Sequence, residues 1–256
     1  MRHFYSLLFL FLFIAFGFSL HAQQAPSAKP VYMIVHGAWG GSWAYRKVDS
    51  LMTERGCIVY RPALTGQGEK VHLASLQVGL NTHINDVVNQ ILYEDLHDVI
   101  LIGHSYGGMV VTGVADSVPG RIRKLIYLDA FVPDNGESLM SIRGIPGESV
   151  NLIAPNGFVV PSWVQAGKLP PKDVPHPVKT WTDTLILRSA FRQKIPTTYI
   201  VTVEKGKKPE NDDFASQAER ARKKEWPVLQ LEADHNPQWS APDALVEILM
   251  QVGSKR

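Results

Sequence analysis

The amino-acid sequence predicts an α/β fold in which helices cover both faces of a mostly parallel central sheet. Three observations lead to this prediction. Six short apolar or β-branched runs read as strands, and helical patterns separate most of them along the chain. The third observation is size: 256 residues, 45% of them hydrophobic and 20% charged, suit one compact domain.

The expected elements can be placed in order along the chain. Strands are expected at residues 31–35, 57–60, 99–102, 125–128, 198–203 and 228–231. Helices are expected at residues 43–55, 82–93, 107–116, 213–224 and 242–252. Because the strands alternate with helices, they should run parallel, and the loops after them should meet at one edge of the sheet.

The alternation fails between Asp134 and Arg188. Glycine and proline recur there, and an aromatic or apolar residue appears every few positions. A segment of this length inside a compact domain is more often a functional lid than an idle loop. We therefore expect a cap at about residues 134–190, inserted after the strand that ends near Leu128.

The first 22 residues have the layout of an export signal. A basic start at Arg2 precedes an apolar run from Phe4 to Leu20, and the small residue Ala22 precedes a polar stretch. A retained membrane anchor is the alternative, because the run approaches the ~20 residues that span a bilayer. A cleaved signal peptide at 1–22 is the favoured interpretation. It predicts a periplasmic or secreted single domain at 23–256, with no stable membrane association.

The charge and the motif content exclude several classes of partner. The formal net charge is only +2, and the basic residues between Arg220 and Lys224 look like the polar face of a helix, so nucleic acid is not expected to bind. The chain has no H-E-x-x-H, C-x-x-C or P-loop motif. Neither a metal nor a cofactor is therefore expected, and the expected partner is a small molecule.

The strongest chemical signal is the motif Gly103–Gly107, which reads G-H-S-Y-G. It follows an expected strand and opens an expected helix, which is the context that a nucleophile elbow requires. A sharp turn there lifts the serine Oγ above the sheet, and the flanking glycines let neighbouring backbone pack close to it. Ser105 is therefore the expected nucleophile.

A serine hydroxyl is a poor nucleophile until a base removes its proton. His235 follows the last expected strand and precedes the last expected helix, which places it at the same edge of the sheet as Ser105. His83, His97 and His176 lie in a helix, a connector and the expected cap, where surface or packing roles suit them better. His235 is therefore the expected general base.

Two carboxylates are candidates for orienting that histidine, because each follows a strand that ends near the site. Asp129 follows Leu128 and has apolar neighbours, whereas Glu204 follows Val203 and stands beside Lys205. An orienting carboxylate is normally buried, which favours Asp129 and leaves Glu204 as the alternative. Third choices follow further along the chain and are better explained as the acidic first turn of a helix: Asp212 and Asp213.

The loop after the first expected strand supplies a candidate for the oxyanion hole. It contains Gly37, Ala38 and Trp39, and its glycines allow the backbone to turn an N–H group toward the nucleophile. We expect the backbone N–H groups of Ala38 and Tyr106 to be the two donors. Trp39 and Trp163 are candidate substrate-binding residues, since aromatic side chains at a pocket mouth suit an apolar acyl or alkoxy group.

Six stretches of this chain resemble a known family. They are residues 36–43, 62–69, 82–87, 103–109, 127–133 and 234–235. Together they are similar to the small α/β-hydrolases that group bacterial esterases with plant methyl-esterases and hydroxynitrile lyases. The resemblance covers the whole expected mature chain. It implies the α/β-hydrolase fold, Ser105 with His235 as the catalytic pair, and Ala38 with Tyr106 as the oxyanion donors.

Two departures from the family pattern matter. Plant members carry an aspartate just after the penultimate strand, where this chain has Glu204 and Lys205. The family's acid is therefore not carried over to this chain, and this favours Asp129 as the orienting carboxylate. Members that cleave cyanohydrins are similar but carry a threonine and a lysine where this chain has Gly37 and Asn236. Lyase activity is therefore disfavoured.

The expected activity is hydrolysis of a small carboxylic ester through an acyl-enzyme on Ser105. A lactonase, for example one acting on acyl-homoserine lactones, is the nearest alternative because it needs the same machinery. A non-catalytic ligand-binding member of the fold is an alternative of another class. The intact pairing of Ser105 with His235 argues against that last alternative.

Overall fold

The computed structural model describes residues 29–164 and 167–254. The expected signal peptide at 1–22 lies outside these residues. Within the described part of the chain, no helix is both long enough and apolar enough to span a bilayer.

Six strands form one sheet in the order β2-β1-β3-β4-β7-β8, and every neighbouring pair is parallel. The strands are β1 (Val31–Val35), β2 (Ile58–Tyr60), β3 (Val99–His104), β4 (Ile122–Leu128), β7 (Thr197–Val203) and β8 (Val228–Glu232). All six expected strands are present within a few residues of their expected bounds.

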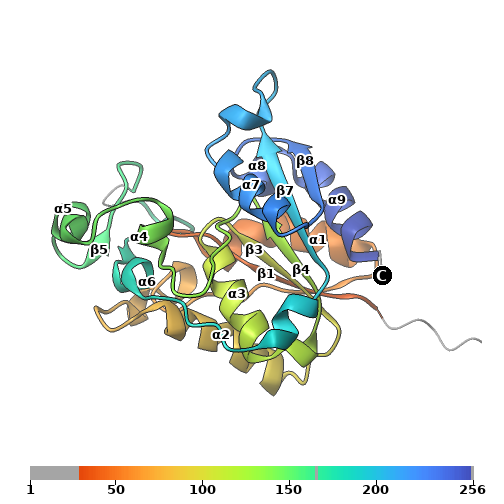
Figure 1. Ribbon diagram of the computed structural model, residues 1–256, viewed down its shortest axis with the longest axis horizontal. Helices are drawn as coiled ribbons and strands as arrows, with labels where there is room; N and C mark the ends of the chain where they lie inside the picture. Colours follow the sequence, from red (N-terminus) through yellow and green to blue (C-terminus); the bar gives the residue numbers. More distant parts are fainter. Residues whose placement is uncertain (1–28, 165–166, 255–256) are drawn as a thin grey trace, which may run out of the picture.

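Helices cover both faces of this sheet (Figure 1). One face packs against α2 (Leu80–Tyr93), α3 (Gly107–Ser117) and α7 (Ala215–Lys223), and the other against α1 (Arg46–Glu54) and α9 (Pro242–Ser254). Strand β1 shows why two cores form, because its side chains alternate. Met33 and Val35 enter the first core, and Tyr32 and Ile34 enter the second.

The strand order explains where a site forms. The chain passes from β1 outward to β2 on one side and then returns to β3 on the other side of β1. Loops that leave the carboxyl ends of two such strands diverge, and ligands bind in the resulting crevice. The loops after β1 and β3 carry Ala38 and Ser105, so two of the expected site segments meet at this switch point.

Residues 134–190 lie between β4 and β7, and we call them the insert. They form short elements: α4 (Leu139–Ile142), α5 (Val150–Ile153), α6 (Lys179–Thr182), and the antiparallel pair β5 (Phe158–Val159) and β6 (His176–Pro177). Figure 1 shows this part, coloured green to cyan, projecting to one side of the layered core.

Two expected helices begin later than predicted. The helix expected at 43–55 starts as the 3-10 turn η1 (Ser42–Tyr45) before α1. The helix expected at 213–224 begins at Ala215, because Asp212 accepts the N–H of Phe214 (2.9 Å) in a local turn. Asp212 and Asp213 therefore lie before the first turn of α7 and not in it.

The remaining short helical elements are η2 (Gly68–Leu73), η3 (Pro119–Arg121), η4 (Gly147–Ser149), η5 (Ala190–Lys194), η6 (Pro209–Asn211) and α8 (Pro237–Ser240).

Candidate active site

Ser105 occupies a strained turn between β3 and α3. Its φ is +53°, in the left-handed region that residues other than glycine rarely adopt. Backbone hydrogen bonds fix this conformation: Ser105 N–H donates to Leu128 (3.3 Å), and its carbonyl accepts from Gly108 (3.0 Å) and Phe131 (3.1 Å). The turn is thus held by α3 and by the loop after β4, and the serine lies at the C-terminal edge of the sheet.

The glycines around Ser105 are required by close backbone packing. A Cβ on Gly103 would lie 2.6 Å from the carbonyl oxygen of Gly107, and one on Gly107 would lie 2.6 Å from that of Val35. At Gly108 a Cβ would overlap the carbonyl oxygen of Phe131. Any side chain at these three positions would force the strand, the helix and the loop apart.

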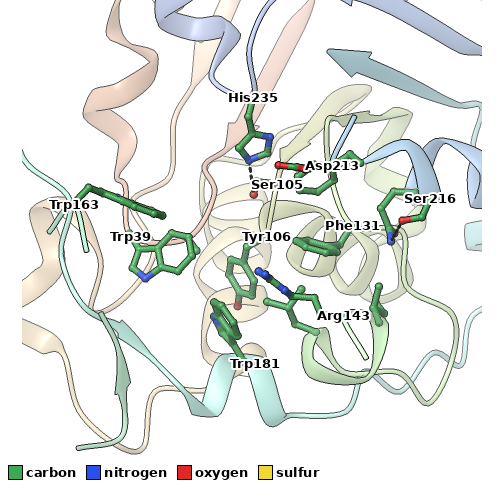
Figure 2. Close-up of a pocket in the computed structure, with 15 residues that line it drawn as sticks. Trp39, Ser105, Tyr106, Phe131, Arg143, Trp163, Trp181, Asp213, Ser216 and His235 are labelled. Atoms are coloured by element: carbon green, nitrogen blue, oxygen red, sulfur yellow. Dashed lines mark hydrogen bonds between the residues drawn. The ribbon is translucent and has the colours of Figure 1, made fainter. Parts of the chain in front are cut away.

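The structure brings Ser105, His235 and Asp129 into one hydrogen-bonded chain. His235 Nε2 lies 3.0 Å from Ser105 Oγ, and His235 Nδ1 lies 2.6 Å from Asp129 Oδ2 (Figure 2 shows the first contact). A carboxylate only accepts, so Nδ1 carries the proton that it donates to Asp129. In the neutral ring Nε2 is then the acceptor and faces the serine hydroxyl, which is the arrangement that general-base catalysis needs.

The two candidate acids have very different surroundings. Asp129 is 1% exposed, and its second oxygen accepts the backbone N–H of Thr202 on β7 (3.0 Å), so both carboxylate oxygens are hydrogen-bonded. Glu204 is half exposed and pairs with Lys207 in the following loop (2.5 Å). The structure therefore brings Asp129 to His235, and Glu204 belongs to the surface.

His104 and Phe214 also hold His235, and neither residue was predicted from the sequence to do so. The Phe214 ring stacks on the imidazole with centroids 4.6 Å apart and planes at 10°. His104 donates its Nε2–H to the backbone carbonyl of His235 (2.7 Å), since a carbonyl only accepts. Burial lowers the pKa of His104 to about 3, so its imidazole stays neutral at ordinary pH.

The loop after β1 lies directly against the elbow. A Cβ on Gly37 would come 3.0 Å from the Ser105 Cβ, so the loop and the elbow are in close contact at this point. The next N–H group, that of Ala38, has no acceptor within the part of the chain that the structure describes, and the same is true of the N–H of Tyr106. Tyr106 follows Ser105 directly in the chain, and Ala38 follows Gly37 in the loop that packs against Ser105. Within the described residues, the backbone N–H groups of both expected donors are unpaired.

The loop after β1, residues 36–41, is hydrogen-bonded to the insert. Trp39 has φ +65°, and its indole N–H donates to the carbonyl of Val159 in β5 (3.0 Å). Its own carbonyl accepts the N–H of Val174 (2.8 Å). The conformation of the loop therefore depends on two backbone groups of the insert.

The hydroxyl group of Tyr106 belongs to a buried network of hydrogen bonds. The Tyr106 hydroxyl donates to His83 Nδ1 (3.0 Å), and His83 Nε2–H donates to the carbonyl of Thr65 (2.9 Å). Burial lowers the pKa of His83 to about 4, and His176 stacks on the same ring with centroids 5.9 Å apart. Of the three histidines expected to serve surface or packing roles, His83 and His176 are buried and His97 is exposed.

A cavity of about 630 Å³ opens above Ser105 and His235. Both expected substrate-binding residues, Trp39 and Trp163, line one side of it, with their rings edge to face at 5.3 Å (Figure 2). The other walls include residues that were not predicted to bind substrate: Phe131, Leu139, Ile142, Arg143, Trp181, Asp213, Phe214, Ser216 and Gln217. The cavity is therefore strongly aromatic, with one cationic and one anionic side chain at its wall.

No group of three or more His, Cys, Asp or Glu residues within 29–164 and 167–254 is arranged to hold a metal ion. The chemistry that this site can perform with its own residues is nucleophilic attack by an activated serine, with an acid-base histidine and two backbone donors.

Comparisons with known proteins identify the family of this chain. The model of the "Alpha/beta hydrolase family" matches residues 33–248. The carbendazim hydrolyzing esterase of Nocardioides sp. (strain SG-4G) is 50% identical over 119 residues, which are 46% of this chain and 49% of the relative. Methylesterase 2 of Arabidopsis thaliana is 28% identical over 112 residues, 43% of each chain. The matched stretches thus span about half the length of these curated relatives or less.

Solved structures share the fold. An extracellular alpha/beta-hydrolase from a Paenibacillus species superposes with a TM-score of 0.72 at 22% identity, covering 88% of this chain and all of the other. A tomato methylketone synthase I variant superposes with a TM-score of 0.69 at 17% identity, covering 90% of this chain and 99% of the other. At these identities the similarity establishes the fold alone.

Proposed function

The chain belongs to the alpha/beta hydrolase family, and from this premise we propose that it is a serine esterase that cleaves a small carboxylic ester through an acyl-enzyme on Ser105. One observation carries the proposal: the continuous hydrogen-bonded chain from Ser105 Oγ through His235 to the buried Asp129. A ligand-binding protein without catalysis has no need of a strained serine aligned with a base.

The proposed reaction has two steps. Ser105 Oγ attacks the carbonyl carbon while His235 Nε2 takes its proton, and Asp129 holds the ring and stabilises the imidazolium. The carbonyl oxygen becomes an oxyanion, which the N–H groups of Ala38 and Tyr106 bind. His235 returns the proton to the alcohol oxygen as the C–O bond breaks. Water then attacks the acyl-enzyme with the same assistance and restores Ser105.

The cavity of about 630 Å³ above Ser105 and the named relatives support the proposed substrate class. The aromatic walls formed by Trp39, Trp163 and Trp181 suit a planar or aromatic group. Relatives named carbendazim hydrolyzing esterase, methylesterase and pyrethroid hydrolase support ester cleavage as the reaction class. A lactone remains a second substrate class for the same residues, and comparing an aromatic methyl ester with a lactone in one assay separates the two.

The direct test is labelling with a fluorophosphonate combined with a pH-stat assay on methyl phenylacetate. Ser105→Ala should abolish labelling and lower kcat by roughly 10³-fold or more. Ser117→Ala is the matched control, because Ser117 is an exposed serine at the end of the same helix. A folded Ser105→Ala protein that turns over like the wild type would exclude the serine mechanism.

For residues 1–22 we propose a cleaved export signal, supported by the basic start and the apolar run that ends at Ala22. Expressed with this leader in a Gram-negative host, the protein should be recovered from the periplasm with an N-terminus near Gln23. N-terminal sequencing checks this, and an intact chain in the membrane fraction would identify an anchor instead.

A further inference from the structure

Arg143 lies in the wall of the large cavity above Ser105, which has a volume of about 630 Å³. Figure 2 shows this arginine across the cavity from His235 and next to Trp181. The centre of its guanidinium group lies over the Trp181 ring, 5.4 Å from the ring centroid. The cavity therefore carries a positive charge among its aromatic walls.

The backbone at Arg143 is held by local hydrogen bonds of the insert. Arg143 directly follows α4, whose first turn is capped by reciprocal hydrogen bonds between Ser138 and Ser141. The N–H group of Arg143 donates to the carbonyl of Leu139 in the same helix (3.1 Å). The short helix thus sets the position from which the arginine side chain reaches the cavity.

The guanidinium group of Arg143 has neither an ion pair nor a hydrogen bond within the part of the chain that the structure describes. Acidic residues of the insert form ion pairs with other cations: Glu137 with Arg220, and Asp183 with Lys179. The N–H groups of Arg143 are therefore available to a ligand in the cavity.

The contact with Trp181 favours a ligand of one kind. Because a guanidinium group is planar, packing one of its faces over the Trp181 ring leaves the N–H groups at its edge free to donate. Two parallel N–H groups match the two oxygens of a carboxylate. An aromatic carboxylate also offers a ring that the tryptophan walls of the cavity can contact.

Asp213 makes the charge of the cavity asymmetric. In Figure 2 this aspartate lies on the same side of the cavity as His235, whereas Arg143 lies on the opposite side. A substrate carboxylate is attracted by Arg143 and repelled by Asp213. The charges therefore favour a pose in which the free carboxylate points away from Ser105 and the uncharged ester group lies beside it.

We propose that Arg143 is a specificity-determining residue that selects esters carrying a free carboxylate, above all half-esters of aromatic dicarboxylic acids. The proposal rests on the serine esterase activity proposed above, in which Ser105 cleaves the ester. Arg143 binds the carboxylate and takes no part in proton transfer. Because the arginine is exposed, two charge-assisted hydrogen bonds in a partly hydrated site should raise kcat/KM by about 10-fold over a neutral ester.

Two pairs of esters of equal shape test this selectivity on the wild-type protein. The first pair is monomethyl terephthalate and methyl 4-carbamoylbenzoate, and the second is 4-acetoxybenzoate and 4-acetoxybenzamide. The members of each pair differ only in having a carboxylate or a primary amide. In at least one pair, kcat/KM should be about 10-fold higher for the anionic ester, and this preference should shrink in about 0.5 M NaCl. No preference for the anion in either pair would overturn the proposal.

Variants of the arginine locate the origin of the preference. Arg143→Met keeps an unbranched chain that can pack on Trp181 but has no charge, so it should lower the ratio of kcat/KM for the carboxylate to kcat/KM for the amide by about 10-fold. Arg143→Lys keeps the charge without the planar fork and should retain part of the ratio. Arg188→Met is the matched control, because Arg188 is another exposed arginine of the insert and does not line the cavity. An unchanged ratio in Arg143→Met would contradict the proposal.

Binding measurements separate this proposal from the serine mechanism. In isothermal titration calorimetry, Ser105→Ala protein should bind monomethyl terephthalate with a Kd about 10-fold lower than that of the matched amide, and adding Arg143→Met should remove the difference. Absence of fluorophosphonate labelling at Ser105 in the wild type would refute the serine mechanism. Normal labelling together with equal Kd values for the two ligands would refute only the role of Arg143.

Discussion

The carboxylate of Asp129 and the Nδ1 atom of His235 lie 2.6 Å apart, although 106 positions separate the two residues in the chain. Strand β7 lies between the strands that carry them, and it serves both. Its residue Ile200 accepts the N–H of Asp129 (2.7 Å), and Thr202 donates to the Asp129 carboxylate. Hydrogen bonds to β7 therefore hold Asp129 in place independently of its contact with His235.

Replacing this acid should affect activity far more than replacing the other candidate. Asp129→Asn removes the charge that stabilises the imidazolium and presents an N–H or a rotated oxygen to Nδ1, so we expect kcat to fall by roughly 10³- to 10⁴-fold. Steady-state hydrolysis of methyl phenylacetate measures this. Glu204→Gln should leave kcat within about 2-fold, because Glu204 is half exposed and paired with Lys207.

Near-UV circular dichroism provides the control that both variants are folded. If Glu204→Gln abolished turnover while Asp129→Asn only lowered the melting temperature, the assignment of the acid would have to be reversed.

His104 should act as a positioning residue. His104→Phe keeps an aromatic ring beside His235 but removes the donor to its carbonyl, so the catalytic loop loses an anchor. We expect kcat to fall by about 10- to 100-fold with a smaller change in KM, in line with the loss of one buried hydrogen bond. His104→Gln retains an N–H donor and should recover part of the loss. A purely packing role would show no recovery with glutamine.

Acid should destabilise the fold through its buried histidines. The pKa of His83 is lowered to about 4 by burial, while the pKa in the unfolded chain is near 6.5. Between these values the unfolded state binds more protons, so this histidine contributes stability above about pH 6.5 that is lost as the pH falls toward 4. Urea midpoints measured from pH 7 to pH 5 should decrease accordingly.

His83→Gln should reduce this pH dependence, because the replacement does not titrate, while His36, His104 and His176, whose pKa values burial also lowers, remain. His97→Gln is the matched control for the substitution itself, since His97 is exposed. Identical slopes for wild type and His83→Gln would show that His83 is not the group that takes up the proton.

The elbow should be intolerant of even one methyl group. Gly108→Ala places a Cβ against the carbonyl oxygen of Phe131, so α3 must move away from the loop after β4. We expect a loss of about 1–3 kcal/mol in the free energy of unfolding, together with slower fluorophosphonate labelling. Gly120→Ala, which meets nothing within 4 Å, should leave both measurements unchanged. Equal labelling rates would mean that the turn accommodates the methyl group.

The sequence was sufficient to predict the sheet and the approximate position of the site. Alternating strand and helix patterns identify parallel strands, and the loops at their carboxyl ends carry Ser105, Asp129 and His235. The choice between Asp129 and Glu204 rested on the polarity of their neighbours, and the structure brings Asp129 to the histidine. The apolar residues on both sides of Asp129 indicated that it would be buried, so this choice could be made from the sequence.

The walls of the site were less accessible to sequence reasoning. Phe214 stacks on His235, and Trp181 lines the large cavity, but each lies in a segment whose position depends on how a long connection returns to the sheet. Tyr45 was expected within a helix, but in the structure it ends the 3-10 turn η1, with its side chain buried. The hydrophobic periodicity of one helix or strand does not predict contacts between residues of separate segments.

The hydrogen bonds between Trp39 and the backbone of Val159 and Val174 limit how the insert of this protein can be replaced, by evolution or by design. The insert and the loop at residues 36–41 are not separate modules. Transplanting the insert of another family member would alter specificity and turnover together, because the graft would replace the two backbone groups that hold Trp39. Successful chimaeras should require residues 36–41 and 134–190 to be exchanged as one unit.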